Sequence, residues 1–399
     1  MRVIIIGGGI GGPLAAIALQ HVGIEAVVYE AHDGPAESLG LFLGLGVNGL
    51  RVLRDLELLD AVLHVDTIPT PSMVFSSTTG KRLGVVSNGW LDAATPSVTL
   101  MRGALQDVLA DEARARGIEI QYRKRFIGFA DLDGRVVARF EDGSEAEGDI
   151  LIGADGIRSR VRAKMDPDAP EPSYTGLLNV GGIVYNSGLP ATPHAMHMIW
   201  GRRAFFGYTV RPSGEAWWFA NLGMQQEPGR AELAAIATDD WKRRLRDLFA
   251  EDQAFISALI QHTDLIGATP IHDMPSLPQW HRGRVGLLGD AAHAVSPSAG
   301  QGASMAMEDA MMLAKCLRDV ADPQRALMRY EEERRPRAER IVATGRKRGS
   351  YKALESRTAV FLRDLFMPLA FRLFASEQAT AWIYDYEIAW DAPVVAYAA

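Results

Sequence analysis

The chain begins with four β-branched residues, Val3 to Ile6, which are followed at once by glycines. A short continuous apolar run of this kind is typical of a strand that is buried on both faces of a parallel sheet. The next apolar stretch, Leu14 to Leu19, predicts a buried helix, and Ala26 to Tyr29 predicts a second strand that ends at Glu30. These segments together indicate a β-α-β unit of about 30 residues.

The pattern then changes to that of shorter and more exposed strands. Segments between Thr67 and Val86 surround the sequence Thr78-Thr79-Gly80-Lys81, which predicts a hairpin turn. Residues 173–264 are rich in aromatic side chains and glycine, and they contain alternating strands such as Ala216 to Ala220 before an amphipathic helix. We therefore expect a second, mainly β domain.

Buried strands and helices return between and after these regions. Residues 101–109 predict a helix, and two apolar runs, 149–152 and 284–289, predict further buried strands. The remainder is predicted to be largely helical. Proline lacks an amide N–H and clashes with the preceding turn, so helix breaks are expected at three positions, Pro297, Pro336 and Pro368.

Charge and cysteine content exclude several classes of function. The chain of 399 residues carries 42 Lys and Arg against 49 Asp and Glu, a net charge of −7 that disfavours a nucleic-acid groove or a polybasic membrane anchor. The single cysteine, Cys316, excludes a disulfide framework and a zinc site built on thiolates. The N-terminus lacks the features of a signal peptide, and no apolar stretch reaches the roughly 18 residues of a membrane span. We therefore predict a cytoplasmic protein with a small-molecule partner.

Glycine is more frequent than average, since 39 of 399 residues exceed the usual share of about 7%. Three of these glycines form the pattern Gly7-x-Gly9-x-x-Gly12 between the first strand and the first helix, and Glu30 follows 18 residues after Gly12. Glycines at this position allow backbone N–H groups to reach a pyrophosphate at the helix N-terminus, and the carboxylate accepts from a ribose hydroxyl. The pattern predicts a dinucleotide site.

Two further motifs place an aspartate at the end of a buried strand, where open α/β sheets bind their ligands. The first is Asp155-Gly156, and the second is Gly289-Asp290, which continues to Pro297-x-x-Gly300-Gln301-Gly302. The three motifs, in this order and spacing, resemble those of the FAD-dependent monooxygenases of the aromatic-hydroxylase class, such as p-hydroxybenzoate hydroxylase, salicylate hydroxylase and zeaxanthin epoxidase. The resemblance covers nearly the whole chain, and residues 382–386 are similar to the tail of the zeaxanthin-epoxidase-like branch.

The resemblance implies an α/β fold in which a Rossmann-like FAD-binding domain carries an inserted, mainly β substrate domain. The expected FAD-binding domain is discontinuous and comprises residues 1–66, 97–172 and 265–350. The substrate domain comprises 67–96 and 173–264, and a helical C-terminal segment comprises 351–399.

The resemblance also implies roles for particular residues. Asp290 would bind the ribityl or pyrophosphate part of FAD, Arg102 the pyrophosphate side, and Asp155 would link FAD and nicotinamide handling. The loop Pro297 to Gly302 would lie against the isoalloxazine. The complete set of implied cofactor residues is Gly7, Gly9, Ile10, Gly11, Gly12, Glu30, Arg102, Asp155, Gly156, Gly289, Asp290, Pro297, Gly300, Gln301 and Gly302.

The implied reaction is that of a single-component monooxygenase. NADH or NADPH reduces FAD, O2 forms a C4a-hydroperoxyflavin, and one oxygen atom passes to a hydrophobic aromatic or polyene molecule, with hydroxylation favoured over epoxidation. Residues 31–38 contain no arginine for a 2′-phosphate, so the preferred nicotinamide cofactor stays open. Two alternatives also stay open: an FAD-dependent reductase or dehydrogenase of the same fold, and a non-catalytic protein that sequesters flavin or ligand.

No side chain is assigned as the catalytic base, and His293 is interpreted as structural. Candidate substrate contacts in the β domain are His197, Tyr208, Arg211, Trp217 and Phe219, although aromatic residues on strands more often belong to a core. His194 and His197 are expected to share a strand face, and no third metal ligand accompanies them, so no metal site is predicted.

One apolar stretch, residues 360–374, has two interpretations. In the first it dips into a membrane interface or meets a lipophilic substrate. In the second, which is favoured, it covers the substrate entrance or a dimer contact. We expect a monomer or a homodimer.

Overall fold

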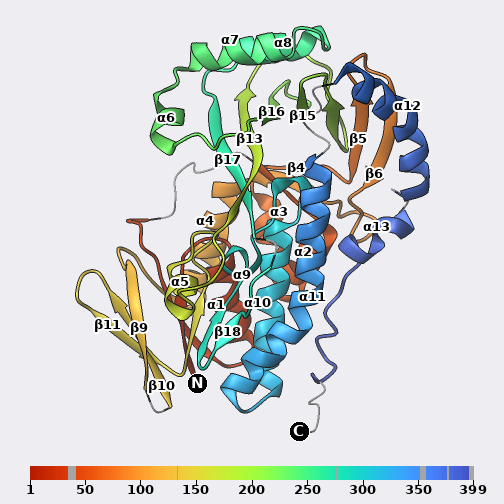
Figure 1. The fold of residues 1–399 in the computed structure, drawn as a ribbon. Helices are drawn as coiled ribbons and strands as arrows, with labels where there is room; N and C mark the ends of the chain where they lie inside the picture. Colours follow the sequence, from red (N-terminus) through yellow and green to blue (C-terminus); the bar gives the residue numbers. More distant parts are fainter. Residues whose placement is uncertain (35–41, 133, 275, 351–355, 375–376, 395–399) are drawn as a thin grey trace.

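The computed structural model describes residues 1–34, 42–132, 134–274, 276–350, 356–374 and 377–394. These residues build two sheet-based parts, one above the other in Figure 1, with a long helix beside them. The predicted α/β fold with a second β-rich part and C-terminal helices is confirmed. Of the segment 31–38, Pro35 to Ser38 lie outside the described residues.

The lower part is built on a six-stranded sheet in the order β18-β19-β12-β1-β2-β8. Neighbouring strands are parallel except for β18 and β19. The strands are β1 (Arg2–Ile6), β2 (Glu25–Tyr29), β8 (Glu119–Gln121), β12 (Ile150–Gly153), β18 (His281–Arg282) and β19 (Val285–Leu287). The parallel order brings the carboxyl ends of β1, β2, β12 and β19 to one edge, where all three sequence motifs begin.

Helices pack around this sheet. They are α1 (Gly11–His21), α2 (Val47–Asp55), α3 (Leu59–His64), α4 (Arg102–Ala115), α5 (Arg160–Met165), α9 (Asp290–His293), α10 (Gly302–Asp319) and α11 (Pro323–Ser350). Two small antiparallel sheets flank them. One contains β9 (Phe126–Leu132), β10 (Arg135–Phe140) and β11 (Glu145–Gly148), and the other contains β3 (Phe42–Leu45), β4 (Thr67–Pro69) and β7 (Val98–Met101).

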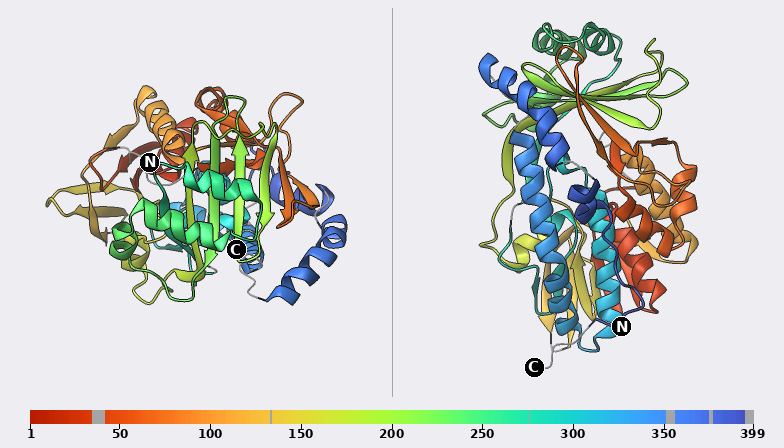
Figure 2. Two further views of the ribbon diagram at one scale, coloured as in Figure 1. Left: turned by 90° about the horizontal axis from the view of Figure 1, so that it is seen from above. Right: turned by 90° about the vertical axis from the view of Figure 1, so that its right-hand side faces the viewer.

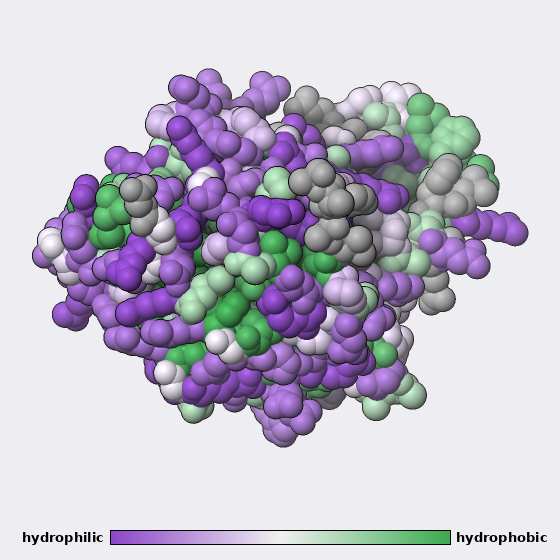
Figure 3. Space-filling view, turned by 90° about the horizontal axis from the view of Figure 1, so that it is seen from below, coloured by the Kyte–Doolittle hydropathy of each residue, from purple (hydrophilic) through white to green (hydrophobic). Residues whose placement is uncertain are grey.

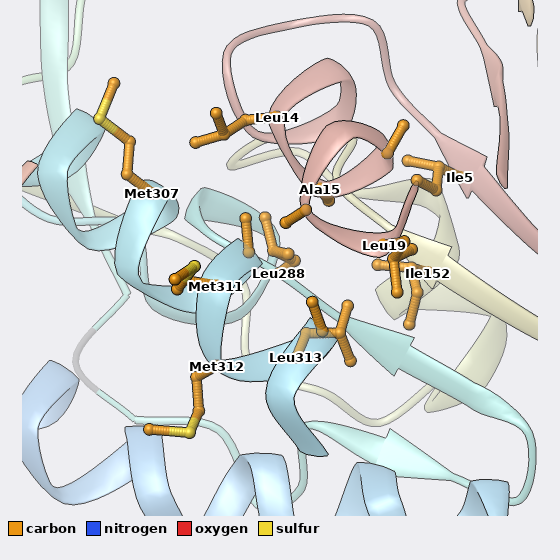
Figure 4. Close-up of a cluster of buried hydrophobic side chains, with 14 of the residues drawn as sticks. Ile5, Leu14, Ala15, Leu19, Ile152, Leu288, Met307, Met311, Met312 and Leu313 are labelled. Carbon is orange, nitrogen blue, oxygen red and sulfur yellow. The ribbon is translucent and has the colours of Figure 1, made fainter. Parts of the chain in front are cut away.

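Helix α1 is buried on all sides because it lies between the sheet and α10 (Figure 4). Leu14 and Leu19 are fully buried in the same cluster as Ile5 of β1 and Leu313 of α10. Each such side chain contributes about 1.5–3 kcal/mol by leaving water. This packing anchors the glycine loop, which enters α1, to the sheet.

The upper part is a seven-stranded sheet in the order β17-β13-β16-β15-β14-β5-β6. Its strands are β5 (Ser72–Ser77), β6 (Arg82–Ser87), β13 (Ser173–Val184), β14 (Ala195–Trp200), β15 (Ala204–Val210), β16 (Ala216–Gly223) and β17 (Gly267–Asp273). β5 and β6 form the hairpin predicted around Gly80. β17 lies beyond the expected domain boundary at 264, because it pairs with β13 rather than with the lower sheet.

One face of the upper sheet is covered by α6 (Arg230–Ala235), α7 (Thr238–Leu248) and α8 (Ala254–Gln261). Figure 2 shows α7 and α8 lying across the strands on the side away from the lower part. Alternate side chains of each strand therefore point to these helices, and the others point towards the lower part.

The C-terminal region contains the short 3-10 helix η1 (Pro297–Ala299), α12 (Arg357–Phe374) and α13 (Glu377–Tyr384). The predicted helix breaks at Pro336 and Pro368 are wrong, since the two prolines lie inside α11 and α12. An interior proline costs about 3 kcal/mol. Ion pairs of Arg334 and Arg337 with acidic residues of α10 hold α11 on both sides of Pro336. Among the described residues, no helix combines the length and apolar character that crossing a membrane requires.

Candidate functional site

A cavity of about 1550 Å³ lies between the two parts and receives side chains from both sheets. Typical small-molecule sites measure about 300–1,000 Å³, so this cavity has room for a long cofactor and a second ligand. All of the cofactor residues expected from the sequence line it except Gly12. The structure therefore brings together three motifs that lie far apart in the sequence, from Gly7 to Gly302.

The glycine loop forms a backbone cradle at one end of the cavity. Gly7 has φ +114°, and a Cβ at Gly12 would lie only 1.9 Å from the carbonyl oxygen of Gly7. A Cβ at Gly9 would meet no protein atom within 4 Å, because Gly9 faces the cavity. The backbone of the loop is thus in close contact with itself at Gly7 and Gly12. The space beside Gly9 is not filled by protein, so a phosphate group has room to approach the backbone there.

Glu30 ends β2 beside this loop and is 8% exposed. Its carboxylate accepts from the backbone N–H of Gly8 at 2.6 Å and from the backbone N–H of His32 at 2.8 Å. These bonds hold the glycine loop against the end of β2. Glu30 also lines the cavity.

The turn at Gly289 and Asp290 is held from below by a buried carboxylate. Gly289, at φ +62°, donates its N–H to Asp309 Oδ2 at 3.0 Å, and Asp309 also accepts from His293 Nε2 at 2.5 Å and from Arg334 Nε at 2.7 Å. Burial acts to raise the pKa of Asp309, but His293 and Arg334 lower it to about 2. Asp309 is therefore a charged anchor, and it presents Asp290 to the cavity.

His293 and Asp155 also have defined partners. His293 packs against Trp280 with ring centroids 4.9 Å apart, which agrees with its structural interpretation. The Asp155 carboxylate accepts from Ser159 Oγ at 2.5 Å and from the N–H of Arg160 at 2.7 Å, so it caps the start of α5. Asp155 lines the cavity as well, and the enclosing protein raises its pKa.

The loop from Pro297 to Gly302 borders the middle of the cavity. Pro297 occupies the first position of η1, and Gly300 adopts the left-handed conformation with φ +65°. Gly302 begins the 18-residue helix α10, and no side chain caps its N-terminus. Gly302 and Ala303 line the cavity, so free N–H groups and the positive end of the helix dipole face it. A group that carries negative charge is favoured here.

A buried hydrogen-bond network supports this loop. Asn48 Nδ2 donates to Gln301 Oε1 at 2.8 Å and to Glu308 Oε1 at 2.6 Å. Arg337 binds Glu308 at 2.8 Å and the carbonyl oxygen of Ile383 at 2.8 Å. Within the described chain, Gln301 Nε2 and Asn48 Oδ1 are buried and have no protein partner. Gln301 lines the cavity, so its Nε2 is a buried donor at the cavity wall that an acceptor on a ligand can satisfy.

Tyr384 was not among the residues expected from the sequence. It is 5% exposed, lines the cavity, and its Cδ1 lies 3.2 Å from the position of a Cβ at Gly46. Burial raises the pKa of Tyr384, and a hydrogen bond from Arg348 opposes this rise. Only the similarity of residues 382–386 to a family tail pointed to this region, since no local pattern marks a tyrosine that arrives from the far end of the chain.

Of the candidate substrate contacts, Phe219 lines the cavity, but His197 and Tyr208 do not. These two lie on the opposite face of the upper sheet, where their rings are 5.2 Å apart and Tyr208 packs against Phe255 of α8. Burial lowers the pKa of His197. The expectation that His197 and Tyr208 line a pocket is therefore corrected. The side chains that face the cavity stand an odd number of positions away on the same strands, at Met196, Met198, Trp200 and Phe205.

Trp217 and Arg211 lie behind the cavity wall. The Trp217 ring is 5.4 Å from that of Phe42, which lines the cavity, and Arg211 stacks on Trp217 at 4.8 Å. His194 precedes β14 with φ +58°, and a spacing of three residues places strand side chains on opposite faces. His194 and His197 therefore do not share a strand face.

The chain was compared with known proteins. A family model described as "FAD binding domain" matches residues 1–344. Aurachin C monooxygenase/isomerase from Stigmatella aurantiaca is 32% identical over 389 residues, which cover 96% of both chains. Zeaxanthin epoxidase from an Oncidium hybrid cultivar is 30% identical over 371 residues, covering 86% of this chain and 54% of that protein.

A solved structure has a closely similar fold. The crystal structure of Klebsiella pneumoniae HpxO with FAD and uric acid superposes with a TM-score of 0.83 at 26% identity, and it covers 96% of this chain and 97% of that one.

Proposed function

Because this chain belongs to the family of FAD-binding monooxygenases, we propose that it hydroxylates a hydrophobic aromatic or polyene molecule with NADH or NADPH and O2 as co-substrates. FAD-dependent monooxygenation is the activity of the family. The substrate, the preference for hydroxylation over epoxidation and the placement of FAD are the proposal. The observation that carries it is the cavity, polar along the three motifs and apolar beyond the loop at Pro297.

The polar end suits FAD residue by residue. Gly9 leaves space for the pyrophosphate, Glu30 would accept from the adenosine ribose, and the N-terminus of α10 would stabilise negative charge on the reduced ring. When bound, FAD would take up hydride from NADH or NADPH and supply the reactivity towards O2. The chain's own residues orient the two ligands and exclude water.

The apolar end supports the choice of substrate. Met196, Met198, Phe205 and Phe219 form its wall beside the loop Pro297 to Gly302, called here the flavin loop. Such a wall favours a flat apolar ring and keeps water away from the reacting atoms, which limits wasteful loss of activated oxygen. The relatives are named for substrates as different as zeaxanthin and urate, so family membership by itself does not select one.

Tyr384 adds a polar contact to this wall. Its hydroxyl accepts from Arg348, and Tyr384 lines the cavity. We propose that its O–H donates to an oxygen on the bound ring. This arrangement favours a phenol, a quinolone or a related oxygenated aromatic over a pure hydrocarbon.

The decisive experiment supplies the FAD-loaded protein with NADH or NADPH and a panel of aromatic compounds, and it measures O2 consumption and the incorporation of isotopically labelled oxygen. Ligand-stimulated O2 consumption with label in the product supports the proposal. Reduction that does not depend on O2 would instead indicate a dehydrogenase, and absence of reduction would indicate a protein that sequesters its ligand.

A pair of variants tests where FAD binds. Gly9→Ala and Gly128→Ala each add a Cβ that meets no protein atom within 4 Å, but only Gly9 lines the cavity. We expect Gly9→Ala to weaken FAD binding and Gly128→Ala to leave it unchanged, with similar unfolding of both apoproteins. Equal FAD affinity in the two variants would contradict the proposed placement.

A further inference from the structure

The cavity does not end at the ring-sized space beside the flavin loop. It continues between the outer strands of the upper sheet and helix α12. The residues that line this extension, called here the apolar arm, are Met73, Phe75, Val86, Met198, Trp200, Ala359, Arg363, Phe366, Met367, Ala370 and Phe371. All but Arg363 are apolar.

The wall of the apolar arm is tightly packed. The rings of Phe75, Trp200 and Phe371 stand 5.0 to 5.6 Å apart in a three-membered cluster. Phe371 presses on the backbone of β6, because a Cβ at Gly84 would lie 2.3 Å from its ring. Aromatic clusters of this kind are stable beyond the area that they bury. This cluster joins α12 to the outer strands, and it forms one wall of the arm.

The single charged group in the arm is already satisfied. Arg363 is 9% exposed, donates to the carbonyl oxygen of Trp200 at 3.0 Å and pairs with Asp364 at 2.8 Å. A ligand carboxylate in the arm would compete with these bonds and with the surrounding apolar wall. An uncharged chain without polar atoms suits the arm better.

The arm reaches the surface at α12. Phe366 lines the cavity and is nevertheless 59% exposed. The outer face of α12 is apolar as well, with Phe361, Leu362, Leu365 and Leu369 exposed. Figure 3 shows this apolar patch at the upper right, in the region of α12. Within the part of the chain that the structure describes, the arm is thus an apolar passage from the flavin loop to the outer face of α12.

We propose that the apolar arm binds a long hydrocarbon chain of the substrate, whose ring lies at the flavin loop and whose chain end emerges at the outer face of α12. The inference rests on the proposed function for the position of the ring. It deepens that function by naming the substrate class, namely an oxygenated aromatic ring that carries an unbranched or lightly branched apolar chain.

The test is a homologous series of 4-alkylphenols, from ethyl to dodecyl, titrated into the oxidised, FAD-loaded protein without NADH or NADPH. The change in flavin absorbance reports the dissociation constant. Each methylene that enters the arm is expected to tighten binding about fourfold. The gain is expected to stop once the chain reaches the surface.

Two neighbouring substitutions on α12 locate the chain. Ala370 lines the arm, whereas Leu369 is exposed and does not line it. Ala370→Trp is expected to end the gain at a shorter chain, while Leu369→Trp, which adds a ring outside the arm, is expected to leave the series unchanged. Thermal unfolding of both variants checks that α12 remains docked.

Dissociation constants that do not change with chain length, or a series that responds equally to the two tryptophans, would overturn the inference. Because the titration needs no turnover, its result is independent of the oxygenation assay. Chain-dependent binding without oxygenation would refute the proposed hydroxylation but not the arm, and oxygenation of short phenols without chain-dependent binding would refute the arm alone.

Discussion

Asp309→Asn tests whether the buried carboxylate beneath the Gly289 turn holds the cofactor end of the cavity. Asp309 is 0% exposed, and its two oxygens accept from Gly289, His293 and Arg334. An asparagine keeps the shape but loses the charge, and it turns an NH2 group towards at least one of these donors. Arg334, also 0% exposed, keeps only Glu308 as an acidic partner.

The expected loss of stability can be worked from the pKa. Lowering the pKa of Asp309 from 3.8 to about 2 corresponds to about 2.5 kcal/mol of stabilisation at neutral pH. Breaking a buried ion pair by removing one partner costs about 3–5 kcal/mol. We therefore expect Asp309→Asn to lower the free energy of unfolding by about 2.5–5 kcal/mol at pH 7.

The pH dependence has a definite sign. A carboxyl whose pKa is depressed by folding stabilises the protein above its unfolded pKa, and this contribution is lost as the pH falls from about 4 towards 2. Urea unfolding of the wild type and of Asp309→Asn at pH 7 and pH 3 measures this contribution. The difference in unfolding free energy between the two proteins should be smaller at pH 3 than at pH 7.

The matched control is Glu145→Gln, since Glu145 pairs with Arg139 at 3.0 Å on the surface, where both side chains are more than half exposed. Such pairs contribute below about 1 kcal/mol. The reasoning is refuted if Asp309→Asn behaves like this control at pH 7, or if its deficit is as large at pH 3 as at pH 7.

Four further predictions concern single residues. Burial raises the pKa of Asp252 to about 6, so its carboxyl destabilises the fold as the pH rises from about 4 through 6. Asp252→Asn should therefore be more stable than the wild type in urea at pH 7 but not at pH 4. The same difference in unfolding free energy at both pH values would contradict this. Cys316 is buried, which raises the pKa of its thiol to about 12. A thiol reagent should therefore react with Cys316 only after the protein unfolds. Rapid labelling of the folded protein would show that the helix around Cys316 opens. Tyr384→Phe removes the O–H donor in the cavity and should weaken phenol binding about two- to tenfold without changing FAD affinity, whereas loss of FAD would assign Tyr384 to the cofactor. Gly12→Ala places a Cβ 1.9 Å from the oxygen of Gly7, so it should abolish FAD binding, and retained FAD in the purified protein would show that the loop tolerates the shift.

Placement of the substrate contacts shows where prediction from sequence fails. Both faces of the upper sheet are apolar, because one packs on α7 and α8 and the other lines the cavity. Hydrophobic alternation then does not distinguish the two faces, so His197 and Tyr208 were as plausible as Met196 and Met198. Only the docking of the two helices decides which set meets the ligand.

Local backbone requirements, by contrast, are visible in the sequence. The strand at Val3 to Ile6, the glycines that follow and the acidic residue at Glu30 specify a tight turn between a buried strand and a helix, which depends on residues close in the chain. The same holds for Asp155 and for the turn at Gly289 and Asp290. Residues close together in the sequence are therefore enough to predict the fold class, the dinucleotide motifs and the edge of the sheet where these motifs meet.

Other features depend on contacts between segments that are distant in the sequence, and only the tertiary structure shows them. Arg337 on α11, Glu308 on α10 and Asn48 on α2 form one network only because three helices pack together, and Tyr384 reaches the cavity from the end of the chain. Pro336 stays within a helix because the same buried ion pairs outweigh its local cost. The passage beneath α12 likewise has no local signal, because a cavity exists only where packed elements leave space between them.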